Sequence, residues 1–249
     1  MVTPVDNIAE NKLTKNLLLS TLLFCLLTTA SNAIAETDQV TLTVVGEVIP
    51  GSCTPSLDNG SKIDYGSFVR TTLTKSSNQL GVKNINLNIS CSANAVVALY
   101  ATDNRKTSIA DGISVETSWV GKKTVTDKDS LFGLGTTKDG EQIGAFSLGI
   151  DYNKMVFDSG TTKTLIKTDN VKADPVVWKS SSDGAIVDHN STAGGWIAIT
   201  PSTSSSTPFS FKTATIPLIV SAAVKKYSAM TITEPVKLDG NVTLSIVYL

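Results

Sequence analysis

The chain has 249 residues, with 21 Lys and Arg against 22 Asp and Glu and a formal net charge of −1. The charges are spread without a basic stretch, which argues against nucleic acid as a partner. Gly, Ser and Thr are abundant, helical periodicity is scarce, and short alternating apolar runs recur. This composition favours an all-β sandwich or barrel.

Residues 1–35 have the pattern of a secretory signal peptide. Lys12 and Lys15 precede an apolar run over 17–27, which is too short for a membrane anchor. Ala33 and Ala35 are small residues at the two positions that a signal peptidase reads. We therefore expect cleavage after Ala35, leaving an exported chain.

Residues 40–49 form the first alternating run of the mature chain. One face of this run carries Val40, Leu42, Val44, Gly46 and Val48, with Thr41, Thr43 and Glu47 between them. The period of two predicts a strand with one buried face. Beyond it, Cys53 and Cys91 remain once Cys25 has left with the signal peptide. An exported chain with two cysteines most simply forms one disulfide between them.

Several further strands are predicted in chain order. Their expected ranges are 63–68, 82–91, 95–102, two near 114–120 and 131–134, then 143–150, 174–178, 196–199 and 209–224. Pro217 should lie at a bulge or an edge, because it has no N–H for a ladder. The low-complexity stretch 200–208 reads as a loop.

The last ten residues form the second strongly alternating run. Val242, Leu244, Ile246 and Tyr248 share one face of it. A strand this apolar at a terminus needs neighbours on both edges, since free N–H and C=O groups otherwise invite pairing. Either the strand predicted over 40–49 pairs with it inside an ordinary sandwich, or that strand binds to another molecule.

Catalytic and metal chemistry find little support in the sequence. His189 is the only histidine, and Asp188, His189 and Ser191 are too close in sequence to resemble an assembled triad. Neither a zinc-ligand set nor an EF-hand spacing is present, so we expect no metal, no cofactor and no enzymatic activity. Trp119, Trp178 and Trp196 are possible sugar-stacking residues, although core packing is the simpler role.

The terminal regions resemble a chaperone–usher fimbrial subunit of the type 1 kind. That family has an alternating N-terminal extension that leads through a Gly-charged-Val step, here Gly46-Glu47-Val48, to the first cysteine. The second cysteine follows an alternating strand, as Cys91 follows 85–90. Ile63-Asp64-Tyr65-Gly66 and Ile216-Pro217-Leu218 also match family steps. The end matches in Gly240-Asn241-Val242-Thr243 and the penultimate Tyr248, with Ile246 in place of Val. The resemblance covers 40–91 and 212–249 and is weak over 100–210.

The resemblance implies an incomplete immunoglobulin-like sandwich, the pilin fold, completed by donor-strand exchange. Residues 36–48 would be the donor extension, and 49–249 the sandwich with insertions in about 100–210. The groove and chaperone-recognition strand would use Gly240, Val242, Leu244, Ile246 and Tyr248.

The implied role is a structural fimbrial subunit that contributes to adhesion. Its partners would be a periplasmic chaperone, an outer-membrane usher and neighbouring subunits, and it would pass through the periplasm to a cell-surface fimbrium. A single-domain tip adhesin that binds a host glycan or another surface receptor is the alternative. A secreted β-sandwich hydrolase is a third reading, disfavoured by the lack of a nucleophile–base pair.

Overall fold

Antiparallel strands make up nearly all of the regular structure. The computed structural model describes residues 40–47, 51–116, 118–158, 160, 164–231 and 234–249. The strands in these residues are β1 (Cys53–Leu57), β2 (Ser77–Ala95), β3 (Val97–Asp103), β4 (Val115–Glu116), β5 (Thr124–Val125), β6 (Phe132–Gly133), β7 (Gly144–Ile150), β8 (Val156–Phe157), β9 (Thr164–Thr168), β10 (Lys179–Ser181), β11 (Ala185–Ile186), β12 (Trp196–Thr200), β13 (Phe211–Lys225) and β14 (Val242–Tyr248).

Short 3-10 helices occupy some of the connections. They are η1 (Asn59–Ser61), η2 (Arg70–Thr72), η3 (Lys106–Ser108), η4 (Lys128–Ser130), η5 (Tyr152–Lys154) and η6 (Tyr227–Ala229). Within the described ranges, no helix has the length and apolar character needed to cross a membrane.

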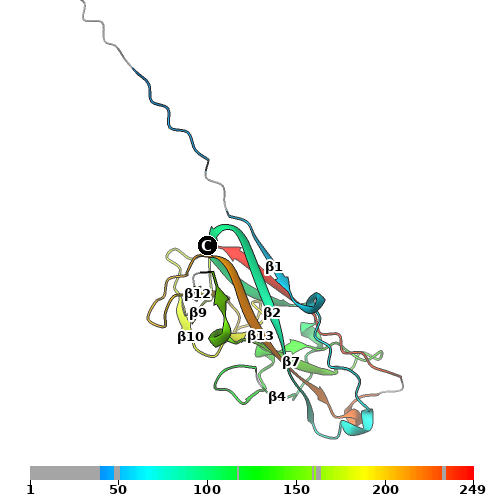
Figure 1. The fold of residues 1–249 in the computed structure, drawn as a ribbon. Helices are drawn as coiled ribbons and strands as arrows, with labels where there is room; N and C mark the ends of the chain where they lie inside the picture. The colour runs from blue at the N-terminus through cyan, green and yellow to red at the C-terminus, as the bar shows by residue number, and fades with distance from the viewer. Residues whose placement is uncertain (1–39, 48–50, 117, 159, 161–163, 232–233) are drawn as a thin grey trace, which may run out of the picture. The chain divides into compact units, whose positions relative to one another are not determined.

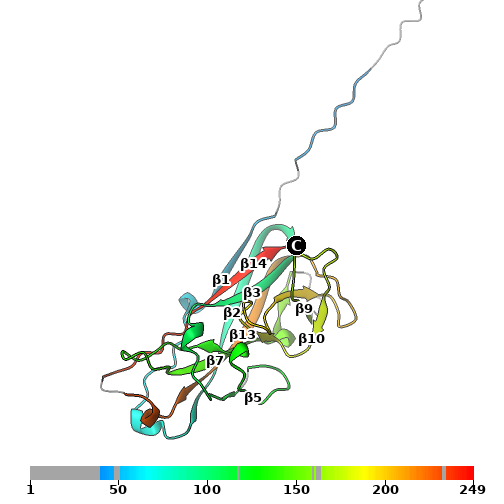
Figure 2. The same cartoon turned by 180° about the vertical axis from the view of Figure 1, so that it is seen from behind.

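The strands form two main sheets and a small third one (Figure 1 and Figure 2). The first sheet has the order β1-β2-β13-β7-β11, with β6 paired to β7 and β8 to β13. The second has the order β10-β9-β12-β3-β14, and β4 pairs with β5 alone. Every pairing between these strands is antiparallel. This architecture confirms the predicted all-β sandwich.

Alternating residues of the long strands supply the main core. On β2, Ile85, Leu87 and Ile89 are buried, whereas Asn86 and Asn88 between them stay partly exposed. The same period places other buried side chains in one cluster that draws on both sheets, including Leu99, Leu148, Leu165, Ile197, Ile216 and Leu218. Burial of one face of each sheet against the other is what holds the sandwich together.

A second, smaller core lies on the outer side of the first sheet. Its buried members include Ile109, Ile113, Val115, Trp119, Val125 and Leu131, together with Ala145 of β7 and Ala223 of β13. The indole Nε1 of Trp119 donates to the carbonyl oxygen of Leu148 at 2.7 Å. Part of the surplus length in 100–210 therefore covers a sheet face that would otherwise be open to solvent.

Two expected strands are absent. Residues 63–68 form no strand, because Gly66 takes a left-handed φ of 76° that interrupts an extended run. Residues 174–178 also form none, since Pro175 cannot donate to a ladder, and β9 and β10 occupy the region instead. Elsewhere β7, β12 and β14 lie where the alternation placed them.

The chain divides into two compact units, Met1–Val48 and Ile49–Leu249. Of the first unit, residues 40–47 are described, and they form no strand. Their apolar side chains face solvent, with Val40 97% and Leu42 87% exposed. Ala33, Ala35 and Val48 lie outside the described residues.

Candidate functional site: an apolar groove beside the last strand

β14 is an edge strand of the second sheet. It pairs with β3 along its whole length, and among the described residues nothing pairs with its other edge. The Asn104 N–H donates to the Asn241 oxygen at 3.0 Å, and the Leu249 N–H donates to the Val96 oxygen at 3.0 Å. The main-chain N–H and C=O groups of the odd-numbered residues of β14 therefore point toward β3. By strand alternation, the main-chain groups of the even-numbered residues point to the open edge. The structure therefore offers an unfilled set of donors and acceptors along an apolar strand.

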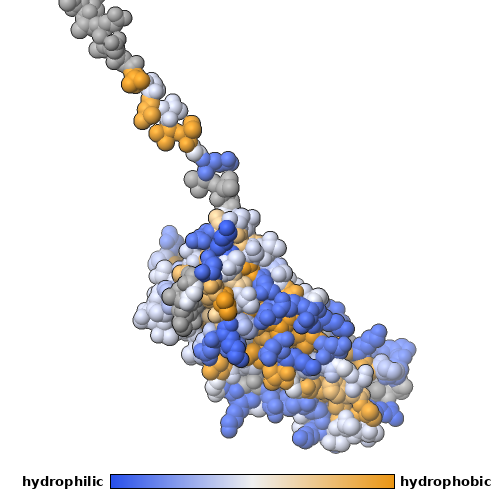
Figure 3. All heavy atoms as spheres, in the orientation of Figure 1, coloured by the Kyte–Doolittle hydropathy of each residue, from blue (hydrophilic) through white to orange (hydrophobic). Residues whose placement is uncertain are grey.

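A groove of about 870 Å³ opens between this strand and the first sheet. Its floor consists of core side chains from β2, β7 and β13, namely Ile85, Phe146, Leu148, Leu218 and Val220. These residues are almost fully buried by their neighbours, yet the space above them is empty of protein. Figure 3 shows an apolar area, bordered by hydrophilic residues, near the positions of the β13 and β7 labels in Figure 1.

One wall of the groove is the strand-free segment 61–73. Ile63 and Tyr65 pack against the main core and line the groove. The Tyr65 hydroxyl donates to the Val220 carbonyl at 3.0 Å, and burial raises the pKa of Tyr65 to about 12. At the rim, the Gly66 N–H donates to the Asp64 carboxylate at 2.8 Å, and this bond, followed by the charge of Lys62, lowers the pKa of Asp64.

The opposite wall combines β14 with the segment that leads into it. Val242 and Leu244 line the groove together with Val236, Leu238 and Gly240. A Cβ at Gly240 would lie 2.9 Å from Phe146 Cε1 and 3.2 Å from Leu134 Cδ2, so glycine is needed for this close approach. The segment is anchored by Asp239, whose N–H donates to the Leu134 oxygen at 2.9 Å and whose carboxylate accepts from Arg105 Nε at 2.8 Å.

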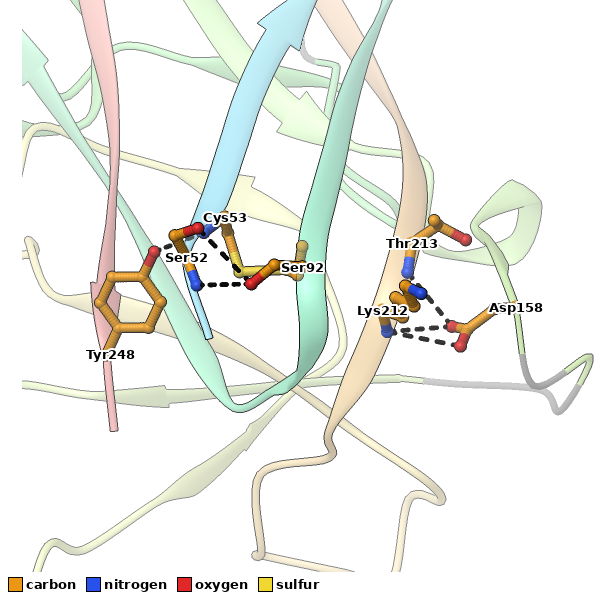
Figure 4. The surroundings of a disulfide bond; sticks show 8 residues. Ser52, Cys53, Ser92, Asp158, Lys212, Thr213 and Tyr248 are labelled. Carbon is orange, nitrogen blue, oxygen red and sulfur yellow. Dashed lines mark hydrogen bonds between the residues drawn. A yellow bond between two sulfur atoms is a disulfide. The ribbon is translucent and has the colours of Figure 1, made fainter. Parts of the chain in front are cut away.

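The groove is closed beside the C-terminal end of β14. There the N–H of Cys53 donates to the Tyr248 hydroxyl at 2.6 Å, which ties β1 to β14 across the two sheets (Figure 4). The Cys53–Cys91 disulfide, as predicted, joins directly opposed residues of β1 and β2 at the same place. Such a bond is typical of proteins exported to an oxidising compartment.

The predicted site residues of the last strand are therefore divided between two roles. Gly240, Val242 and Leu244 line the groove, whereas Ile246 packs against the main core and Tyr248 forms the closed end. The groove continues beyond the start of β14, where Phe68, Leu73 and Met230 line it. Sequence reasoning did not place these three in the groove: Phe68 was expected at the end of a strand over 63–68, and Leu73 and Met230 lie in segments without apolar alternation.

The residues considered for sugar or catalytic chemistry are mostly engaged in packing. Trp119 belongs to the second core, and Trp196 is half-buried beside Tyr100 and His189, with ring centroids 6.2 and 6.0 Å away. His189 Nδ1 lies 3.1 Å from the Ala101 carbonyl oxygen. Within the described ranges, no three His, Cys, Asp or Glu side chains are grouped so as to hold a metal ion.

Comparison with known proteins gives the family of the chain. Residues 42–147 match the family described as Protein of unknown function (DUF1120). The chain is 36% identical to Protein GltF of Escherichia coli strain K12 over 254 aligned positions, covering 94% of this chain and 98% of GltF. It is 29% identical to Uncharacterized protein YhcF of the same strain over 225 positions, covering 85% of this chain and 91% of YhcF. The chain therefore belongs to the family of GltF.

Proposed function

We propose that this protein is a structural subunit of a chaperone–usher fimbria, assembled by donor-strand complementation. The observation that carries the proposal is the apolar groove along an unpaired strand edge, in a chain that also has an exposed alternating segment at 40–47. The groove would receive residues 40–48 of a neighbouring copy, or a strand of a periplasmic chaperone before assembly. The role is structural, without catalysis.

The dimensions of the two parts agree. β14 has seven residues, which span about 23 Å at roughly 3.3 Å per residue. Val40 to Gly46 also make seven residues, so the segment is long enough to pair with the open edge of β14. This is β-augmentation, of which complementation between chaperones and pilins is a known instance: main-chain hydrogen bonds give affinity, and pockets for alternate side chains give specificity.

The energetics require both kinds of contact. Burial of Val40, Leu42, Val44 and Val48 would contribute about 6–12 kcal/mol, as an upper bound. Association itself costs about 4–15 kcal/mol in lost translational and rotational freedom. The two ranges overlap, so side-chain burial alone leaves little net affinity, and the hydrogen bonds along β14 would add to it.

The position of the closed end favours one strand direction. The segment that precedes Cys53 in each chain, here called its tail, leaves the sandwich at Cys53, beside Tyr248. A donor antiparallel to β14 would leave the groove at the Val242 end, so the next sandwich would lie at the opposite end from the tail. A parallel donor would place the next sandwich where the tail departs. Only the antiparallel arrangement lets a head-to-tail series continue without crowding.

The test uses two complementary full-length variants. Gly46→Leu places a bulky side chain in the tail, and Leu244→Asp places a carboxylate in the groove; Val45→Leu is the matched tail control. We expect fibres by electron microscopy, after co-expression with a chaperone and usher, for wild type and Val45→Leu but for neither blocked variant. Mixing the two blocked variants should give a discrete heterodimer on size exclusion, with the intact tail in the intact groove. Fibres from both blocked variants would refute the proposal.

A further inference from the structure

Exposed large apolar side chains concentrate at the two ends of the groove. In the described part of 51–249, nine such residues are exposed, and five of them lie at these ends: Phe68, Val69, Tyr227, Tyr248 and Leu249. Single exposed apolar residues are normal on protein surfaces, whereas a gathering of them at a functional feature marks an interaction site.

The open end of the groove carries the first group, here named the far-end patch: Phe68, Val69 and Tyr227. Phe68 lines the groove and is still 43% exposed, and Val69 is 67% exposed. The N–H of Tyr227 donates to the Leu73 oxygen at 2.9 Å, which joins η6 to the segment after η2. Both views show η2 and η6 side by side, at the opposite end of the sandwich from the C-terminus (Figure 1 and Figure 2).

The closed end carries the second group, here named the root patch: Tyr248 and Leu249, which are 50% and 45% exposed. Both residues are fixed by hydrogen bonds. The Leu249 N–H donates to the Val96 oxygen at 3.0 Å, and the Tyr248 hydroxyl accepts from Cys53. Patches held in this way lose little freedom on binding, which lowers the cost of contact.

We propose that the far-end patch of one copy packs against the root patch of the next copy along the fibre. The inference rests on the proposed function and on the length of the connection. Residues 49–52 join Val48 of the donor strand to Cys53, and these five steps along the chain reach at most about 18 Å when extended. The root patch includes Tyr248, whose hydroxyl accepts from the Cys53 N–H. An antiparallel donor therefore holds this patch within that distance of the point where the donor leaves β14, at the end from which the groove continues to Phe68.

The contact is too small to hold two copies together by itself. It involves five side chains, well below the roughly 20–30 residues on each side of a stable interface. A short tether, however, gives an effective concentration in the millimolar range, at which weak apolar contacts form. The patches therefore set the angle between successive sandwiches rather than the ability to assemble. Only copies already joined through the groove make this contact.

The experiment is cysteine cross-linking in assembled fibres. The double variant Val69→Cys/Leu249→Cys is treated with a short bismaleimide and run on a reducing denaturing gel. The matched control is Val177→Cys/Leu249→Cys, because Val177 is 63% exposed but belongs to neither patch. We expect a ladder of covalent oligomers from the first pair and none from the control, with each single variant also giving none.

The outcomes separate this inference from the proposed function. Fibres that form normally but give no ladder with Val69→Cys/Leu249→Cys, or an equal ladder with the control pair, overturn the patch contact and leave donor-strand assembly standing. Absence of any assembly by the wild-type chain overturns both. A ladder that persists when Gly46→Leu is added shows contact without the tether and also contradicts the inference.

Discussion

Val44 and Val45 are adjacent residues of the same type, and they test whether the tail enters a groove as a strand. In the free chain they are equally exposed, at 87% and 86%, so truncating either leaves the sandwich unaffected. In an added strand, Val44 faces the groove with Val40 and Leu42, whereas Val45 faces away. The two substitutions to alanine should therefore differ only in the complex.

The magnitude follows from the buried area. Val→Ala removes two methyl groups, worth about 1.6 kcal/mol at roughly 0.8 kcal/mol per buried carbon, which is about 10- to 20-fold in affinity. A labelled peptide of residues 36–49 is bound to the Gly46→Leu chain, whose groove is intact, and competed with unlabelled peptides. Val44→Ala should weaken competition by that factor and Val45→Ala by less than about twofold. Equal losses, or a larger loss for Val45→Ala, would refute the alternating geometry.

Three further changes probe the walls of the groove. Cys53→Ser removes a disulfide that spans 38 positions and should lower the free energy of unfolding in urea by about 4 kcal/mol; an unchanged midpoint would contradict this. Gly240→Ala should lower thermal stability by about 1–3 kcal/mol, because its Cβ meets Phe146, whereas Gly46→Ala meets nothing within 4 Å and should be neutral. Absorbance titration should show a step from Tyr65 at about pH 12, above the ordinary tyrosine value of 10.0, and Tyr65→Phe should abolish that step. Because the raised pKa means that the folded state favours protonated Tyr65, the stability contributed by this proton is complete below pH 10.0 and is lost as the pH rises through about 12; a titration with no step near 12 would refute the burial of Tyr65.

The alternating pattern was sufficient to predict β14 but not the groove beside it. Strand alternation is a local property, and it placed Val242 and Leu244 on the correct face. The wall over 61–73 has no strand, and its position follows from Gly66 and from the bond between Tyr65 and Val220. Such tertiary contacts leave no periodic signal in the sequence.

Pro217 shows how tertiary context modifies a sound local rule. We expected it at a sheet edge or a bulge, yet it lies inside β13, paired with Asn86 of β2. On the other side of β13, Pro217 lies between the stretch that pairs with β7 and the stretch that pairs with β8. There only the Asp151 N–H reaches the Pro217 oxygen, at 2.9 Å. The missing N–H therefore faces a gap between two partner strands. The rule that Pro avoids paired positions holds, but the gap could not be located from sequence.

The closed end of the groove gives any assembly its direction. The Cys53–Tyr248 bond ties the two sheets together there, and the Cys53–Cys91 disulfide holds β1 to β2 within the first sheet. In the proposed assembly a strand would pair along β14, and the sandwich that follows it would be accommodated only at the open end. The same bond fixes the point from which the chain's own tail departs. In the proposed assembly, entry and departure would thus lie at opposite ends of one sandwich, and each added copy would present the next open end. In the proposed head-to-tail assembly, a sandwich with one open and one tied end would therefore add copies in a single direction.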